Sequence, residues 1–69
     1  MNTEIKLLDV VALTEDLPEH GLRRGQVGTI VEVLGQDAFI VEFVDNNGRT
    51  YATLSLRAGQ LMVLHHQSA

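Results

Sequence analysis

Apolar residues gather in five short runs along the chain, and segments rich in Gly, Asp, Asn and Pro separate them. The runs contain many Val, Ile, Phe, Tyr and Thr residues, which favour strands, whereas the separating residue types favour turns. The pattern therefore predicts five strands, over residues 7–14, 27–34, 38–44, 49–56 and 61–64.

The connections between the later runs predict hairpins. Gly35-Gln36-Asp37 has the spacing of an antiparallel hairpin loop. Asn47-Gly48 is typical of a two-residue type I′ turn, in which both central residues need positive φ. The segment RAGQ at 57–60 predicts a single 3₁₀ turn before the last strand.

Alternation along the strands predicts which side chains face the core, because successive side chains on a strand point to opposite faces. Glu32 and Glu42 are expected in solvent. The inward set is then Val31, Val33, Phe39, Val41 and Phe43.

The turns extend this reasoning to cross-strand register. A two-residue turn at 47–48 predicts three apolar pairs, which are Phe43 with Ala52, Val41 with Leu54, and Phe39 with Leu56. In the hairpin between the strands at 27–34 and 38–44, inward residues pair with inward residues only if the loop has an odd length, and we expect three or five residues. The odd register also pairs Glu32 directly with Glu42.

These elements predict an all-β fold, a small SH3-like barrel of five antiparallel strands with one 3₁₀ turn before the last strand. An OB fold is the nearest competitor, but it usually needs more chain and a proper helix. We expect one domain over residues 1–64 and a flexible tail over 65–69.

Composition narrows the function classes. Without cysteine the chain has no disulfide and no thiolate metal site. A net charge of −4 disfavours nucleic acid as a partner. The run from Leu7 to Leu13 is too short and interrupted for a signal peptide or a membrane span, so we expect no membrane insertion and a cytoplasmic location.

The glycine-rich stretch HGLRRGQVGT at 20–29 is a candidate for a phosphate-binding loop. Its glycines have the spacing of neither a Walker loop nor a dinucleotide fingerprint, and it leads into a predicted strand. We expect positive φ at Gly21 and Gly25 and a bend or close backbone approach at Gly28. Arg23 and Arg24 are interpreted as solvated loop residues, with an anion-binding role as the alternative.

Candidate chemistry is sparse, and we predict a protein that is not an enzyme and uses no cofactor or metal. His65 and His66 are adjacent, so on an extended chain they point to opposite sides and cannot serve one metal. His20 is a lone loop histidine, and Ser55 has no identifiable base.

The outward face carries more apolar residues than a solvated sheet usually does. It includes Leu34 and Val44, and its predicted partner-binding residues are Ile30, Glu32, Ile40, Glu42 and Tyr51. We weigh two interpretations: a surface for a protein partner or self-association, and a second core covered by the 15–25 loop or the first strand.

The blocks LPEHGL-RRGQVGT and VEFVD-NGRT, with a closing LRAGQLMVL, resemble a family of short bacterial proteins, common in cyanobacteria, catalogued only as a domain of unknown function. The resemblance covers about residues 7–64 and implies a small β barrel with no established activity. It also suggests a partner encoded nearby, as in toxin–antitoxin pairs. RRGQVGTIVEVL is similar to the KOW motif of RNA-contacting barrels, and the strand order looks like small docking subunits of photosynthetic complexes.

Our leading hypothesis is a non-enzymatic module that binds a protein partner through the outward face. The alternative is a KOW-like nucleic-acid-binding module that uses Arg23, Arg24, Arg49 and Arg57. A docking subunit of a larger redox or membrane complex is a third possibility.

Overall fold

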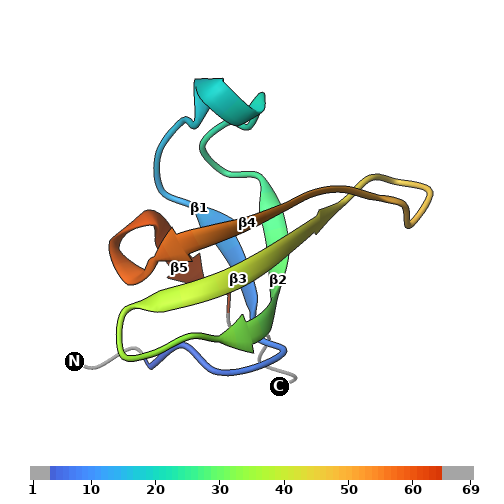
Figure 1. Ribbon diagram of the computed structural model, residues 1–69. Coiled ribbons are helices and arrows are strands. Elements are labelled where there is room, and N and C mark those ends of the chain that lie inside the picture. Colours follow the sequence, from blue (N-terminus) through green and yellow to red (C-terminus); the bar gives the residue numbers. More distant parts are fainter. Residues whose placement is uncertain (1–3, 65–69) are drawn as a thin grey trace, which may run out of the picture.

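The computed structural model describes residues 4–64, which form the strongly twisted five-stranded sheet shown in Figure 1. Its strands are β1 (Val10–Leu13), β2 (Val27–Val33), β3 (Ala38–Val44), β4 (Thr50–Arg57) and β5 (Leu61–Val63). The 3₁₀ turn η1 (Pro18–His20) lies between β1 and β2, and η2 (Ala58–Gln60) precedes β5. The predicted all-β class, five antiparallel strands and final 3₁₀ turn are confirmed.

The strands follow the order β4-β3-β2-β1-β5, and each neighbouring pair is antiparallel. The internal strands β3, β2 and β1 each have two partners, whereas β4 and β5 stand at the two ends of the order. In Figure 1, β3 and β4 run crosswise to β1 and β2. Closure of this sheet into an SH3-like barrel stays a prediction.

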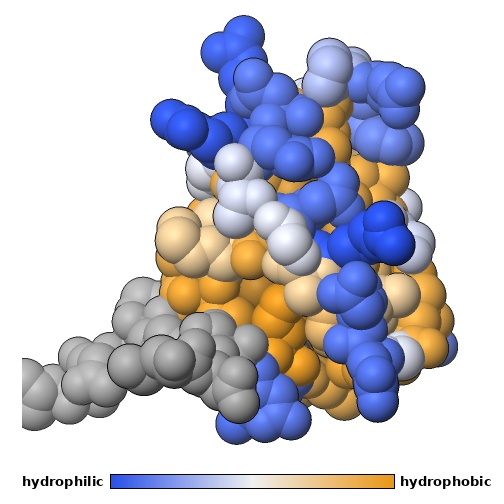
Figure 2. Space-filling model, turned by 90° about the vertical axis from the view of Figure 1, so that its left-hand side faces the viewer, coloured by the Kyte–Doolittle hydropathy of each residue, from blue (hydrophilic) through white to orange (hydrophobic). Residues whose placement is uncertain are grey.

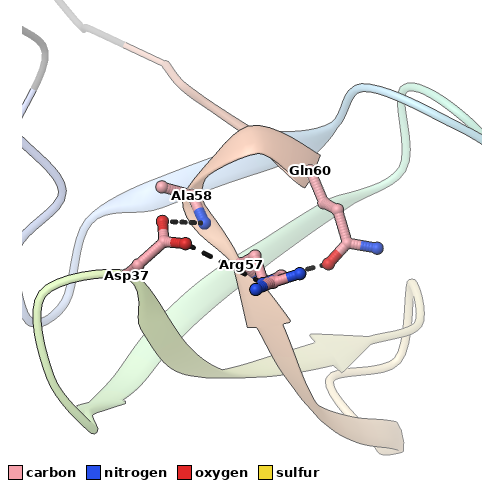
Figure 3. Close-up of polar contacts among 4 residues, drawn as sticks. All are labelled: Asp37, Arg57, Ala58 and Gln60. Carbon is pink, nitrogen blue, oxygen red and sulfur yellow. Dashed lines mark hydrogen bonds and ion pairs between the residues drawn. The ribbon is translucent and has the colours of Figure 1, made fainter.

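Polar contacts among Asp37, Arg57, Ala58 and Gln60 hold the chain where β4 ends and η2 begins (Figure 3). The Gln60 side-chain oxygen accepts a hydrogen bond from the backbone N–H of Arg57 at 2.9 Å. The Asp37 carboxylate accepts one from the N–H of Ala58 at 3.3 Å, and it lies 3.8 Å from Nε of Arg57. These contacts join the β2–β3 loop to the end of β4, which allows β5 to return beside β1.

One hydrophobic core lies inside the bent sheet and draws on all five strands and the β1–β2 loop. Both Val11 and Leu13 of β1 are buried in it, and Leu22 contributes from the loop. The remaining buried members are Ile30, Phe39, Val41, Phe43, Leu56 and Leu61. The predicted burial of Phe39, Val41 and Phe43 is confirmed.

The β3–β4 hairpin has the predicted register. The pairs Phe43 with Ala52, Val41 with Leu54, and Phe39 with Leu56 all occur. Each brings two apolar side chains together on the core side of the sheet.

The turn of this hairpin differs from the prediction. The N–H of Gly48 donates to the carbonyl of Asp45 at 3.0 Å, and the N–H of Asp45 donates to the carbonyl of Arg49 at 2.9 Å. Gly48 has φ 79°, whereas Asn47 does not have positive φ. The two-residue type I′ turn is therefore wrong: the Asp45 carboxylate accepts the N–H groups of Asn47 and Arg49 and holds a wider loop.

The β2–β3 hairpin keeps the predicted odd loop but not the predicted facing. The N–H of Leu34 donates to the carbonyl of Ala38 at 2.9 Å, so the loop has three residues, 35–37. A β-bulge then shifts the register between Ile30 and Glu32, and Ile30 instead of Val31 lies opposite Val41. Ile30 is 0% exposed, whereas Val31 and Val33 are 38% and 45% exposed, so the predicted burial of these two valines is wrong, although Val33 lies opposite the buried Phe39.

The glycines of the stretch at 20–29 have the conformations and contacts that the sequence predicts. Gly21 and Gly25 have φ values of 69° and 93°, as predicted. A Cβ atom on Gly28 would lie 2.7 Å from Cγ1 of Val41 and 3.0 Å from Cδ1 of Phe43. The close approach predicted at Gly28 is therefore confirmed, and β2 packs tightly against β3 there.

The first strand is shorter than predicted, because a turn replaces its beginning. The N–H of Asp9 donates to the carbonyl of Lys6 at 3.0 Å, and the Asp9 carboxylate accepts the N–H of Lys6 at 2.8 Å. Leu7 and Leu8 occupy the tip of this turn, and Leu8 has φ 72°. Local hydrogen bonding by the Asp9 side chain thus overrides the strand preference of the apolar run.

Candidate functional site

Three of the five predicted partner-binding residues share one surface on the solvent side of β2 and β3. Ile40 lies directly opposite Glu32, and Glu42 follows Ile40 two positions along β3. Glu32 is exposed, whereas Ile40 and Glu42 are half-buried. We call Glu32, Ile40 and Glu42 the acidic face. It presents an apolar side chain between two carboxylates.

The carboxylates of the acidic face have no hydrogen-bond or ion-pair partner within residues 4–64. The ion pair found in this part of the chain joins Arg57 to Asp37 instead. Glu42 has threonines as its cross-strand neighbours, Thr29 on β2 and Thr53 on β4. Both glutamates can therefore accept hydrogen bonds from a cationic group supplied by another molecule.

The predicted direct pairing of Glu32 with Glu42 is wrong. A three-residue loop sets Glu32 opposite Ile40, and the bulge sets Glu42 opposite Thr29. Two like charges therefore do not face each other across the strands, and their repulsion is weaker than in a direct pair.

Ile30 does not belong to the exposed surface. Its side chain is fully buried and packs in the core with Val41 and Phe43. The bulge at Val31 is the physical reason, because the extra residue reverses the side of the sheet on which the preceding residues point. Ile30 is therefore unavailable to a partner of the folded domain.

Tyr51 lies beside the core rather than in the acidic face. A second bulge falls between the pairs Val44–Thr50 and Phe43–Ala52, and Tyr51 is the extra residue. The Tyr51 and Phe43 rings lie 6.4 Å apart between centroids, tilted by 42°. The Tyr51 hydroxyl accepts a hydrogen bond from Nε2 of Gln26 at 2.7 Å, so the half-exposed ring covers one end of the core.

Arg23 and Arg24 lie beside carboxylates, which weakens the case for an anion site. They line an open hollow together with Glu15 and Asp16, and the Asp16 carboxylate accepts the backbone N–H of Arg24 at 2.8 Å. An anion in this hollow would meet two negative side chains. The anion-binding role of the two arginines stays a prediction.

Residues that could hold a metal do not gather in the described chain. No group of three or more His, Cys, Asp and Glu side chains within residues 4–64 has the arrangement of a metal site. His20 is exposed in η1. His65 and His66 lie outside the described residues.

Apolar side chains reach the surface at several places around the acidic face. Leu34, at the end of β2, is 49% exposed, and Val44, at the end of β3, is 45% exposed. From the side of η2 and β5, Figure 2 shows apolar residues in the lower part of the molecule and hydrophilic residues at the η1 end.

Among residues 4–64, no helix has the length and hydrophobicity needed to span a membrane.

A cleft between the β1–β2 loop and the end of β4 was missed by sequence reasoning. Residues 15–20 form one wall, and residues 55–56 and Gln60 form the other. The sequence contains no motif for it, because these segments are far apart along the chain and each is an ordinary loop or strand end.

Comparison with known proteins places the chain in a family. No curated protein and no solved structure matches it. A family model described as "Domain of unknown function (DUF4926)" matches residues 7–63, which is most of the chain. The match includes both hairpins and the loop between β1 and β2. The chain is a member of this DUF4926 family.

Proposed function

We propose that the chain is a non-enzymatic module that binds a protein partner through the acidic face. The observation that carries this proposal is the surface formed by Glu32, Ile40 and Glu42, in which a half-buried isoleucine lies between two carboxylates without partners in residues 4–64. An interface of this kind combines an apolar centre with a polar, charged rim.

The chemistry of the surface favours a partner with a basic and apolar contact region. Lys or Arg side chains of the partner would meet Glu32 and Glu42, and an apolar side chain would pack on Ile40. Exposed Leu34, near Glu32 at the end of β2, extends the apolar contact beyond Ile40.

Part of the outward row is covered by the protein itself, and the acidic face is covered only in part, because Glu32 is exposed and Ile40 and Glu42 are half-buried. Ile30 belongs to the same core as Val41 and Phe43, not to a second one. Leu34 and Val44 remain about half exposed, with fractions of 49% and 45%. This exposure supports the interpretation that the outward row is a contact surface for another molecule, rather than the interpretation that the 15–25 loop covers it.

Capture of a partner by the full chain tests the proposal. A tagged chain is used as bait in lysate of the source cells, and bound proteins are identified by mass spectrometry. The variant Glu42→Lys reverses one charge of the acidic face, and Glu4→Lys makes the same change at an exposed residue of the N-terminal segment. We expect a specific partner to be lost with Glu42→Lys and retained with Glu4→Lys.

The result is interpreted only for variants with the wild-type thermal unfolding midpoint, so that loss of fold is excluded. A partner retained by Glu42→Lys and by the double variant Glu32→Lys/Glu42→Lys would contradict the assignment of the acidic face. Copurified RNA that dissociates as salt rises would instead favour the nucleic-acid alternative.

A further inference from the structure

The outer edge of β4 has no backbone partner in the described chain. β4 is the last strand of the sheet order and pairs along one side with β3. Within residues 4–64, no backbone hydrogen bond links residues 50–57 to a strand other than β3. On such an edge, alternate N–H and C=O groups point away from the sheet and can pair with an added extended chain.

This edge strand borders the cleft of about 450 Å³ between the β1–β2 loop and η2. Ser55 and Leu56 of β4 line the cleft from one side, and residues 15–20 line it from the other. An extended segment paired along the end of β4 would therefore place its backbone between β4 and the loop, with its side chains pointing alternately to the two faces of the sheet.

The walls of the cleft are held in place by hydrogen bonds. Leu17 and Leu22 exchange two backbone hydrogen bonds, at 2.9 and 3.1 Å, which close the η1 loop. Nε2 of Gln60 donates to the Glu15 carboxylate at 3.1 Å and joins η2 to this loop. The N–H of Thr14 also donates to the carbonyl of Gln60 at 2.9 Å. The cleft is thus preformed, which lowers the entropic cost of binding.

The side chains that line the cleft select the kind of segment that fits. Leu17 and Pro18 provide apolar contact, whereas Leu56 is almost fully buried in the core and lines the cleft only with the small part of its surface that stays exposed. The lining contains three carboxylates, those of Glu15, Asp16 and Glu19, and no Lys or Arg, although Glu15 and Asp16 also border Arg23 and Arg24 in the adjoining hollow. Apolar contact beside carboxylates matches an arginine side chain, whose aliphatic stem packs while its guanidinium forms charge-assisted hydrogen bonds.

We propose that this cleft binds an extended segment of another protein that pairs with the edge of β4 and inserts an arginine side chain toward Glu15, Asp16 and Glu19. This proposal and the proposed function both treat the chain as a protein-binding module, and the cleft is a second site that borders the acidic face, because Ser55 lies opposite Ile40. The two sites are tested independently.

Two labelled peptides of alternating Thr and Val provide the probe, one with a central arginine and one with citrulline, which has nearly the same shape without the charge. Their binding to the full chain is measured by fluorescence anisotropy at low and high salt. We expect the arginine peptide to bind about fivefold more tightly at low salt, a difference typical of exposed charge pairs. The difference should shrink at high salt, where exposed charges are screened.

A matched pair of variants locates the peptide. Glu19→Gln removes one cleft charge from an exposed side chain, and Glu4→Gln removes the same charge from an exposed residue of the N-terminal segment. We expect Glu19→Gln to weaken the arginine peptide about threefold and to leave the citrulline peptide unchanged. Glu4→Gln should leave both affinities unchanged. Amide spectra of each variant establish that the fold is retained.

Backbone amide shifts during titration report the second part of the proposal. Shifts at Ser55, Leu56 and the η1 loop are expected, because the peptide pairs with β4 there. Equal binding of the two peptides, or no binding of either, would overturn the cleft proposal and leave the acidic face to its own test. Shifts confined to β2 and β3 with sensitivity to Glu42→Gln would also overturn it, and would favour the acidic face.

Discussion

The two hairpins of the β2–β3–β4 meander follow the same alternation rule with different success. In β3–β4 all three predicted core pairs occur, although the loop is longer than predicted. In β2–β3 the loop has a predicted length, yet Ile30 is buried and Val31 is 38% exposed, the reverse of the expected burial. Each hairpin contains a bulge, and the position of the bulge decides the outcome.

The bulge of β3–β4 is harmless to the prediction because it lies outside the core pairs. Tyr51 is inserted between the turn and the pair of Phe43 with Ala52, where it absorbs the extra loop residue. The bulge of β2–β3 lies in the middle of the strand. Alternation predicts facing up to a bulge and fails across it.

On each side of its bulge, β2 alternates between side chains that face the core and side chains that face solvent. Counting from Gly28, whose missing Cβ faces Val41 and Phe43, alternation places Ile30 inward. Counting back from Glu32, alternation places Val31 inward. The extra residue at Val31 reconciles the two phases, so that the tight contact at Gly28 and the solvated Glu32 both occur.

The largest expected effect separates Ile30 from Val31. Because Ile30 is fully buried, Ile30→Ala should lower the free energy of unfolding by about 2–5 kcal/mol, from lost burial and the cavity left behind. Val31→Ala, at a side chain 38% exposed, should cost about 1 kcal/mol or less. Chemical denaturation measures both.

A protein this small can unfold with Ile30→Ala, and Ile30→Val then supplies a milder probe with an expected cost of about 0.5–1.5 kcal/mol. A larger loss of stability for Val31→Ala than for Ile30→Ala would contradict the bulge in β2. It would instead favour unbroken alternation, with Val31 buried and Ile30 in solvent.

The second-largest expected loss of stability concerns the close contact of Gly28 in β2 with β3. A Cβ at Gly28 would lie 2.7 Å from the Val41 side chain and 3.0 Å from the Glu42 carbonyl oxygen. Gly28→Ala should therefore destabilise by about 1–3 kcal/mol, as overpacking does. Gly35→Ala is the control in the same hairpin, since nothing lies within 4 Å of its added Cβ. Similar unfolding midpoints for the two variants would contradict the close packing of β2 on β3.

The residues that could be predicted are those whose environment is local. The acidic face was identified because Glu42 and Ile40 lie on a strand whose core pairing is regular, and Glu32 lies beyond the bulge of β2. The 3₁₀ turn at Ala58–Gln60 follows from a short segment whose Gln60 side chain bonds back to Arg57.

The features that could not be predicted depend on packing between distant segments. Ile30 is buried because β2 must fit between β1 and β3, and no residue type at 30 or 31 signals that fit. The cleft joins residues 15–20 to the end of β4 and to Gln60, and its three acids look like solvated loop residues until the fold brings an unpaired strand edge beside them.

The smallest effect tests the turn that the β3–β4 bulge accommodates. Gly48 has φ 79° whereas Asn47 does not have positive φ, so Gly48→Ala should cost about 1 kcal/mol of unfolding free energy. Asn47→Ala should cost only a few tenths of a kcal/mol, within the range of surface substitutions, because the Asp45 carboxylate bonds the backbone N–H of residue 47 and not its side chain. A two-residue type I′ turn would require positive φ at both positions, and the two alanine variants would then lose similar stability. Unequal losses in thermal unfolding, with unchanged β3–β4 cross-strand contacts in spectra of both variants, would establish that Tyr51 absorbs the longer loop while the core register is preserved.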